Sequence, residues 1–252
     1  MLPVDDAVAR RYPPLVTWGL IGLNVLVFFY ELSLSEARLV AFVDHYGLVP
    51  ARLFDRTHPV GVSDLVPLVT NMFLHAGWAH LLLNMWTLWI FGPAVEDRLG
   101  AKRYLAFYLT LGLAASVSHA LFNPHSSLPA LGASGAISGI LGAYVRMFPY
   151  ARLIVVVPIL FFPFFFEMPA IAFALFWLMM QIIPGLAALV EPSTVGGVAW
   201  WAHIGGFAAG WFLVTHVRRP PHKHRPFFAD ETRTGHWPDG RRLHRNYNGP
   251  WG

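Results

Sequence analysis

The sequence predicts an all-α membrane protein in which six membrane-spanning helices form a bundle, one of them a short central helix. Of the 252 residues, 56% are hydrophobic and only 13% are charged, and the mean hydropathy is +0.49. This composition excludes an ordinary soluble domain and is typical of proteins that cross a membrane several times. A short helix that opens on a serine and an uneven distribution of basic residues define the architecture further.

The short helix is predicted within Leu131–Met147, LGASGAISGILGAYVRM. From Ser134 to Phe148 an α-helix rises roughly 22 Å, whereas the hydrocarbon core of a bilayer is about 30 Å thick. The helix therefore begins below the membrane surface. Its first backbone N–H groups have no partners within the helix, and each would cost several kcal/mol in lipid. The sequence thus predicts a polar cavity around Ser134.

The chain divides into three expected regions. Residues 1–14 form a cytoplasmic N-terminal segment, residues 15–217 form the membrane domain, and residues 218–252 form a disordered basic tail. Apart from the short helix, the membrane domain is expected to contain five helices, at Leu15–Leu32, Trp78–Leu99, Tyr104–Phe122, Pro169–Leu189 and Val198–Val217.

The first of these helices is expected to be retained, because no small-residue cleavage site follows it. The long connection Ser33–Thr70 mixes apolar patches with Asp residues, so we expect it to lie partly at the membrane interface.

The apolar stretch Ala151–Phe166 decides between six and seven crossings. Pro158 and Pro163 would leave unbonded carbonyls in a lipid-facing helix, so a re-entrant or interfacial segment is expected instead. With six crossings, the basic residues that flank the spans all fall on the side of the termini: Arg10, Arg11, Arg98, Lys102, Arg103, Arg146, Arg152, Arg218 and Arg219. The positive-inside rule then predicts cytoplasmic termini in a multi-pass protein of the cell (inner) membrane.

Several polar and small residues lie inside the predicted spans. His80 and Asn84 are one turn apart on one helix, and His203 lies about one turn inside the last helix. Glycines line one face of the short helix, at Gly135, Gly139 and Gly142, and one face of the last helix, at Gly206 and Gly210. Taken singly, a polar residue near a helix end is more often an ordinary interface residue, and small residues at this spacing are a common packing device.

The combination of these residues favours a catalytic role over a purely structural one. Close contact between two parallel glycine-bearing helices would bring Ser134 and His203 to a similar depth. A neutral imidazole can take the serine proton as the hydroxyl attacks a carbonyl, and can return it to the leaving amine. No Asp or Glu lies at a matching depth to orient His203, so we expect a dyad. The Ser134 N–H, Asn84 and His80 are candidate donors to the oxyanion, each worth about 3 to 4 kcal/mol.

These residues resemble the motifs of the rhomboid intramembrane serine proteases, over roughly Val16–Val217. FLHAGWAHLLLNMW is similar to the family's His-x-x-x-Asn element and ends in a turn similar to Glu-x-Arg. Gly132-Ala133-Ser134-Gly135 is similar to the Gly-x-Ser-Gly nucleophile motif, and Ala202-His203-Ile204-Gly205-Gly206 to the last helix. The resemblance implies a six-helix fold, a Ser134–His203 dyad, no cofactor or metal, and cleavage of transmembrane helices near their outer ends.

Two further expectations concern Ser138 and the fifth helix. Members of the family often carry an aromatic ring one turn after the serine, which stacks under the histidine; here that position is Ser138, whose hydroxyl can hydrogen-bond the imidazole of His203 instead. Pro184 and Gly185 weaken the outer end of Pro169–Leu189, so we expect this helix to be the gate for a substrate helix entering from the lipid.

Other functions were weighed against a protease. A non-catalytic rhomboid-like protein that binds or escorts membrane helices shares the fold, and Ser138 is its best support. A transporter or a haem protein would use histidines as ligands, with candidates His75, His80, His119, His203 and His216. The sequence has no HExxH motif, no pair of mid-span Asp residues and no cysteine. Membrane protein substrates and lipid are the expected partners, and no aromatic-basic pattern indicates nucleic acid.

Overall fold

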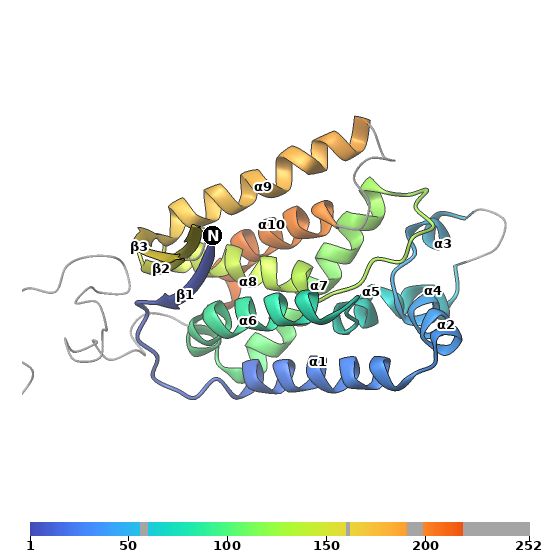
Figure 1. Ribbon diagram of the computed structural model, residues 1–252, viewed down its shortest axis with the longest axis horizontal. Coiled ribbons are helices and arrows are strands. Elements are labelled where there is room, and N and C mark those ends of the chain that lie inside the picture. The colour runs from blue at the N-terminus through green and yellow to red at the C-terminus, as the bar shows by residue number, and fades with distance from the viewer. Residues whose placement is uncertain (56–59, 160–161, 191–198, 219–252) are drawn as a thin grey trace, which may run out of the picture.

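The long helices are arranged side by side in the computed structural model, which describes residues 1–55, 60–159, 162–190 and 199–218 (Figure 1). Within these residues the long helices are α1 (Leu15–Ser33), α6 (Trp78–Leu99), α7 (Ala101–Phe122), α8 (Ser134–Met147), α9 (Ala170–Val190) and α10 (Trp200–Val217). Their bounds agree closely with the stretches expected from the sequence. The predicted basic tail beyond Arg218 lies outside the described residues.

Several of these helices have the length and composition of membrane spans. Among the described residues, α1, α7 and α9 each qualify alone. A fourth span arises if Val62–Phe73 and α6, which meet at an angle of 78°, count as one broken span. The chain is therefore mostly helical, with three to four candidate membrane spans.

The connection between α1 and α6 folds into short helices instead of an open loop. These are α2 (Glu36–Tyr46), α3 (Pro50–Phe54), α4 (Val62–Leu65), α5 (Pro67–Thr70) and the 3₁₀ helix η1 (Asn71–Phe73). In Figure 1 the helices α2 to α5 gather at one end of the bundle, opposite the end that holds strands β1 (Leu2–Asp6), β2 (Arg152–Ile159) and β3 (Phe162–Pro169).

Helix α8 lies at the centre of the bundle. Every residue from 135 to 145 is buried. Its main neighbour is α10, followed by α7 and α6, and Figure 1 shows it between α10 and α6. With 14 residues it is about 21 Å long. A helix this short and this deeply enclosed places its first turn inside the protein.

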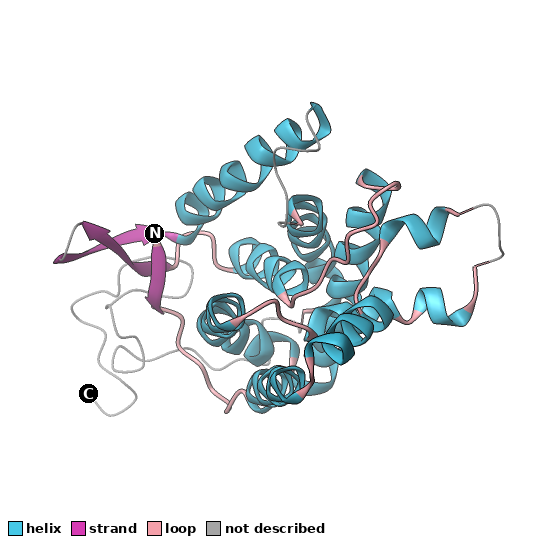
Figure 2. Cartoon of the chain, turned by 45° about the vertical axis from the view of Figure 1, so that its right-hand side comes forward, coloured by secondary structure: helices cyan, strands magenta, loops and turns pink. Residues whose placement is uncertain are grey.

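The expectation of an all-α fold is wrong at one end of the bundle. Strands β1, β2 and β3 form an antiparallel sheet in the order β1-β2-β3 (Figure 2). The N-terminal segment is therefore part of the fold, since β1 pairs with a strand far along the chain. Leu153 and Val155 of β2 are fully buried, so this face of the sheet packs on the bundle.

The described residues of Ala151–Phe166 contain no helix, which agrees with the expectation from Pro158 and Pro163, but they form strands. Pro158 of β2 is paired with Pro163 of β3. The pairing between β1 and β2 reaches only to Val156, so Pro158 lies where β2 has β3 as its sole neighbour in the sheet. A strand tolerates the missing N–H at such a place, and the run Ile154–Val157 favours extended backbone.

A carboxylate from another helix caps the start of α1. The residue before α1 is Pro14, which offers no capping side chain. Instead Glu96 near the end of α6 accepts hydrogen bonds from Val16 N (2.9 Å), Thr17 N (2.8 Å) and Thr17 Oγ1 (2.7 Å). The negative carboxylate also lies at the positive end of the helix dipole. Glu96 thereby fastens α1 to α6.

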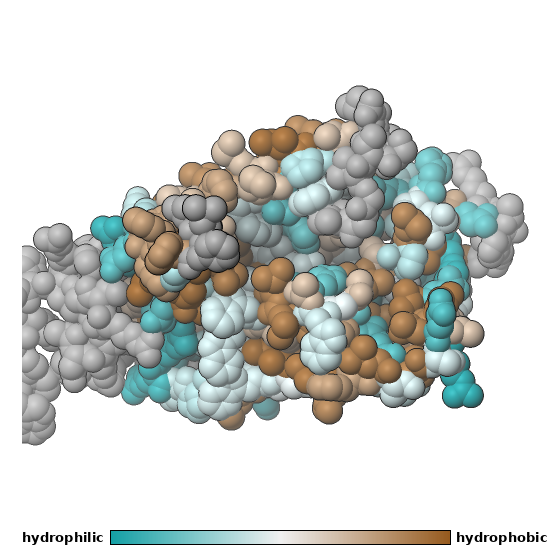
Figure 3. Space-filling model, in the orientation of Figure 1, coloured by the Kyte–Doolittle hydropathy of each residue, from teal (hydrophilic) through white to brown (hydrophobic). Residues whose placement is uncertain are grey.

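The surface agrees with a protein held in a membrane. In Figure 3 the middle of the visible face is largely brown to white, and teal side chains gather towards its left and right margins. Large apolar side chains of α1 and α9 are exposed, among them Leu26, Phe29, Leu175 and Ile183. A protein with such an apolar surface would aggregate in water, whereas lipid can cover that surface.

Replacement of Glu96 by Gln should destabilise the protein. The amide keeps one acceptor oxygen for three donors, so buried N–H groups of α1 lose their partner, and we expect the free energy of unfolding to fall by about 2–4 kcal/mol. Denaturant titration in detergent micelles measures it. The control Glu36→Gln, at an exposed position of α2, should change it little. If Glu96→Gln and Glu36→Gln had equal free energies of unfolding, the capping role of Glu96 would be contradicted.

Asp6 should make stability depend on pH. Burial raises its pKa above the ordinary value of 3.8, against the opposing effects of Arg10 and of a hydrogen bond from Tyr144, and Asp5 adds to the rise. The folded protein then holds a proton that the unfolded chain has already released. The free energy of unfolding should therefore decrease as pH rises from about 4 to the raised pKa, and then level off.

The Asp6→Asn variant tests this pH dependence. In unfolding titrations run at a series of pH values, Asp6→Asn should no longer show the decrease in the free energy of unfolding as pH rises from about 4. The control Glu36→Gln should still show it. A slope that is unchanged in Asp6→Asn would show that Asp6 titrates normally.

Candidate active site

The candidate site lies where the first turn of α8 meets the first turns of α10. The Ser134 Oγ atom is 2.8 Å from Nε2 of His203, which is hydrogen-bonding distance. Both residues are partly accessible. The structure thus brings together the two residues that the sequence analysis paired, although 69 positions separate them in the chain.

Glycines allow α8 and α10 to approach this closely. A Cβ atom added to Gly206 would collide with the backbone of Gly135, and one added to Gly210 would collide with the backbone of Gly139. Later residues of α10 meet later residues of α8, so the two helices run parallel. The two backbones are in contact with no side chain between them. The Ser134 and His203 side chains are therefore long enough to meet.

The other two sequence candidates, His80 and Asn84, border the loop that leads into Ser134. A Cβ atom on Gly132 would overlap the His80 ring and would lie 3.7 Å from Asn84 Nδ2. Gly132 has φ +120°, a conformation that glycine adopts without strain. The Nδ2 group of Asn84 is buried and has no hydrogen-bond partner among the described residues. An unused donor therefore lies beside the residues just before Ser134.

Ser138 does not hydrogen-bond the His203 ring. Its hydroxyl donates to the backbone carbonyl of Ser134 at 2.6 Å. Both ring nitrogens of His203 have other partners, because Nε2 faces Ser134 and Nδ1 lies 2.7 Å from Oε1 of Gln181. Trp177 and Trp200 flank the ring, with centroids at 6.0 and 6.4 Å.

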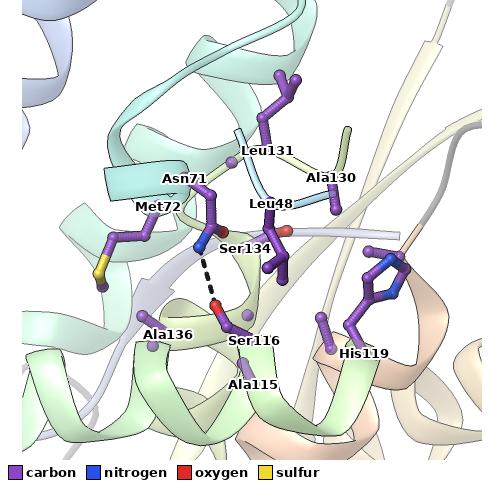
Figure 4. Close-up of a pocket in the computed structure, with 15 residues that line it drawn as sticks. Leu48, Asn71, Met72, Ala115, Ser116, His119, Ala130, Leu131, Ser134 and Ala136 are labelled. Atoms are coloured by element: carbon purple, nitrogen blue, oxygen red, sulfur yellow. Dashed lines mark hydrogen bonds between the residues drawn. The ribbon is translucent and has the colours of Figure 1, made fainter. Parts of the chain in front are cut away.

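A small pocket lies on another side of Ser134. Its volume of about 20 Å³ is enough for one water molecule. The lining includes the polar residues Asn71, Ser116, His119 and Ser134, and Figure 4 shows the Asn71 amide directed at Ser116, to which it donates at 2.9 Å. The start of α8 thus has polar groups around it, as its depth requires.

Sequence reasoning missed two features of the site. It gave no role to Gln181, which lies within the expected span Pro169–Leu189 and supplies the partner of His203 Nδ1. It also gave no role to Asn71 and Ser116. In each case the available signal was a single amide or hydroxyl in apolar surroundings, and a single polar residue does not reveal which helix it faces.

The fold and the site define a multi-pass helical membrane protein with a serine and a histidine paired inside the bundle. Comparison with known proteins agrees with this class. A family model described as Rhomboid domain matches residues 62–220, and the chain belongs to the rhomboid family.

Three relatives illustrate the similarity. Rhomboid protease GluP of Bacillus subtilis is 36% identical over 143 residues, which cover 55% of this chain and 26% of the relative. Rhomboid protein 1, mitochondrial, of Saccharomyces cerevisiae is 28% identical over 153 residues, which cover 59% of this chain and 41% of the relative. Putative rhomboid protease YdcA of B. subtilis is 39% identical over 80 residues, which cover 32% of this chain and 40% of the relative. The chain spans less than half the length of each of these relatives.

Replacement of Gly210 by Ala should force α8 and α10 apart. The new methyl group would collide with backbone atoms of Gly139, which cannot move as a side chain can. We expect a loss of about 1–3 kcal/mol in the free energy of unfolding. The matched control is Gly22→Ala on α1, where a Cβ meets nothing within 4 Å; it should stabilise slightly, by less than about 1 kcal/mol. Denaturant titration in micelles compares them, and similar effects would refute the close contact.

Proposed function

We propose that this chain is an intramembrane serine protease, which hydrolyses peptide bonds in or near transmembrane helices of membrane protein substrates through a dyad of Ser134 and His203. The observation that carries the proposal is the 2.8 Å distance between Ser134 Oγ and His203 Nε2 at the start of a buried helix. Membership of a family with relatives named rhomboid proteases supports it.

In the proposed reaction, His203 Nε2 takes the hydroxyl proton as Ser134 Oγ attacks the carbonyl carbon of the scissile bond. The tetrahedral intermediate collapses with transfer of that proton to the leaving amine, and an acyl-enzyme ester remains on Ser134. A water molecule, activated by the same imidazole, then hydrolyses the ester and restores the free serine. The polar pocket beside Ser134 has room to hold that water within the bundle.

The oxyanion needs hydrogen-bond donors during the attack. The backbone N–H of Ser134 lies at the N-terminus of α8, where helix N–H groups are free and the dipole favours negative charge. Asn84 Nδ2 is buried without a partner among the described residues, and an N–H of the neighbouring His80 is the third proposed donor. Buried, unused donors are the groups that gain most from a transient negative oxygen.

The proposed membrane arrangement has six crossings, made by α1, α6, α7, α8, α9 and α10, with both termini in the cytoplasm. Contacts at the sheet end of the bundle support this placement. The backbone N–H groups of Arg11 and Tyr12 donate to Asp97, and Arg98 lies over the ring of Phe148, the residue that follows α8. The basic residues near the ends of α1, α6 and α8 therefore share one side. Helix α9 is the proposed lateral gate for the substrate.

The test is cleavage of a labelled single-span substrate by the purified protein in proteoliposomes. Ser134→Ala and His203→Ala should abolish cleavage and labelling by a serine-directed phosphonate. Asn84→Ala should lower kcat by about 10²–10³-fold, because one oxyanion donor is lost. Ser127→Ala, an exposed serine in the connection before α8, is the control that should retain full activity.

The same experiment separates the protease from the non-catalytic alternative. A folded parent protein that binds membrane helices, yet neither cleaves a panel of substrates nor reacts with the phosphonate, would be an escort protein. Cleavage that persists in Ser134→Ala would show that a different residue is the nucleophile.

A further inference from the structure

The partner of the second His203 nitrogen comes from a different helix than either member of the dyad. Gln181 projects from α9, and its side chain is buried with only 7% exposed. Its Oε1 atom lies 2.7 Å from Nδ1 of His203. A buried polar side chain on an otherwise apolar helix is costly unless its groups are paired, so this contact requires a reason.

The second hydrogen bond of Gln181 fixes which way its amide points. The Nε2 group donates to the backbone carbonyl of Trp177, one turn earlier on α9, at 3.2 Å. A carbonyl oxygen can only accept, so the amide nitrogen must face Trp177 and the amide oxygen must face His203. The oxygen in turn can only accept, which means that Nδ1 of His203 carries the proton.

This assignment determines the state of the nitrogen that faces the serine. In a neutral imidazole one nitrogen is a donor and the other is an acceptor. With the proton on Nδ1, the lone pair of Nε2 points at Ser134 Oγ, and this is the tautomer that accepts a hydroxyl proton. The opposite tautomer would place an N–H against the serine and could not act as its base.

We propose that Gln181 is a positioning residue for His203, which holds the ring in the base-competent tautomer and orientation by accepting the Nδ1–H bond. The inference rests on the proposed function and adds a third, neutral member to the dyad. An amide suits this environment better than a carboxylate, because a charged group in the same buried position would carry a large desolvation cost.

The position of Gln181 on α9 makes the arrangement conditional. The inner half of α9 is anchored by buried Ala170, Phe173 and Ala174, whereas exposed residues such as Met179 and Met180 dominate further along. Gly185, one turn beyond Gln181, still lies against α10, because a Cβ atom added there would be 3.3 Å from Cβ of Trp200. The hydrogen bond to His203 exists only while α9 lies against α10 at the level of Gln181.

The experiment compares three variants of the full chain in proteoliposomes. Gln181→Met keeps the approximate size but removes the acceptor, and should lower kcat by about 10- to 100-fold with KM within about twofold of the parent value. Gln181→Glu should retain a higher kcat than Gln181→Met, because a carboxyl oxygen can still accept the Nδ1–H bond. Met179→Leu, at an exposed neighbouring position, is the control and should match the parent.

A spectroscopic measurement reads the tautomer without any cleavage. Nitrogen NMR of His203 in the Ser134→Ala background should report a protonated Nδ1, and the addition of Gln181→Met should produce a mixture of tautomers. Since this readout needs no substrate, it decides the inference even if the parent protein proves inactive and the proposed function fails.

Two results would overturn the positioning role. One is an unchanged nitrogen spectrum in Gln181→Met. The other is a loss confined to KM, or a kcat in Gln181→Glu that is no higher than in Gln181→Met, in variants with parental thermal unfolding; these would assign Gln181 to packing or substrate docking.

Discussion

The direct backbone contact between α8 and α10 is the constraint on which the site depends. In lipid, apolar helices gain little from hiding their side chains from one another, so association relies on close packing of small residues and on hydrogen bonds. Gly206 and Gly210 provide that packing against Gly135 and Gly139. Once the two backbones touch, the reach of Ser134 and His203 is fixed by covalent geometry, and neither side chain needs a flexible loop to bring it into place.

A second demand follows from the depth of the site, because polar groups there must be satisfied within the protein. Several of them have hydrogen-bond partners within the bundle. Asn71 donates to Ser116, Ser138 donates to the backbone carbonyl of Ser134, and Gln181 accepts from His203. Asn84 Nδ2 is an exception among the described residues, and it lies beside the approach to Ser134. A donor left open where a negative oxygen is proposed to form is the pattern that preorganised electrostatic catalysis requires.

The sequence predicted the bounds of the long helices well, because apolar length and the short Ser134 helix are local signals. The proximity of Ser134 and His203 was also predictable, since matching glycine stripes identify two helices that pack together. The β-sheet was not, because β1 has no apolar alternation of its own and its partner lies far along the chain. Gln181 was missed for a related reason: which neighbour a lone amide meets depends on the rotation of α9 about its axis, and a nearly uniform apolar helix carries no periodicity that defines it.

The sheet has a consequence for the order in which the protein is assembled. Strand β1 is synthesised before any of the helices, yet Leu2 pairs opposite Val156, which follows α8 in the chain. At translation rates of about 5–20 residues per second, β1 waits on the order of ten seconds for its partner. During that time the unpaired strand is open to other partners. The pairing then ties the segment before α1 to the strands that connect α8 to α9, so closure of the sheet is a long-range step that must wait until α1, α6, α7 and α8 have been synthesised.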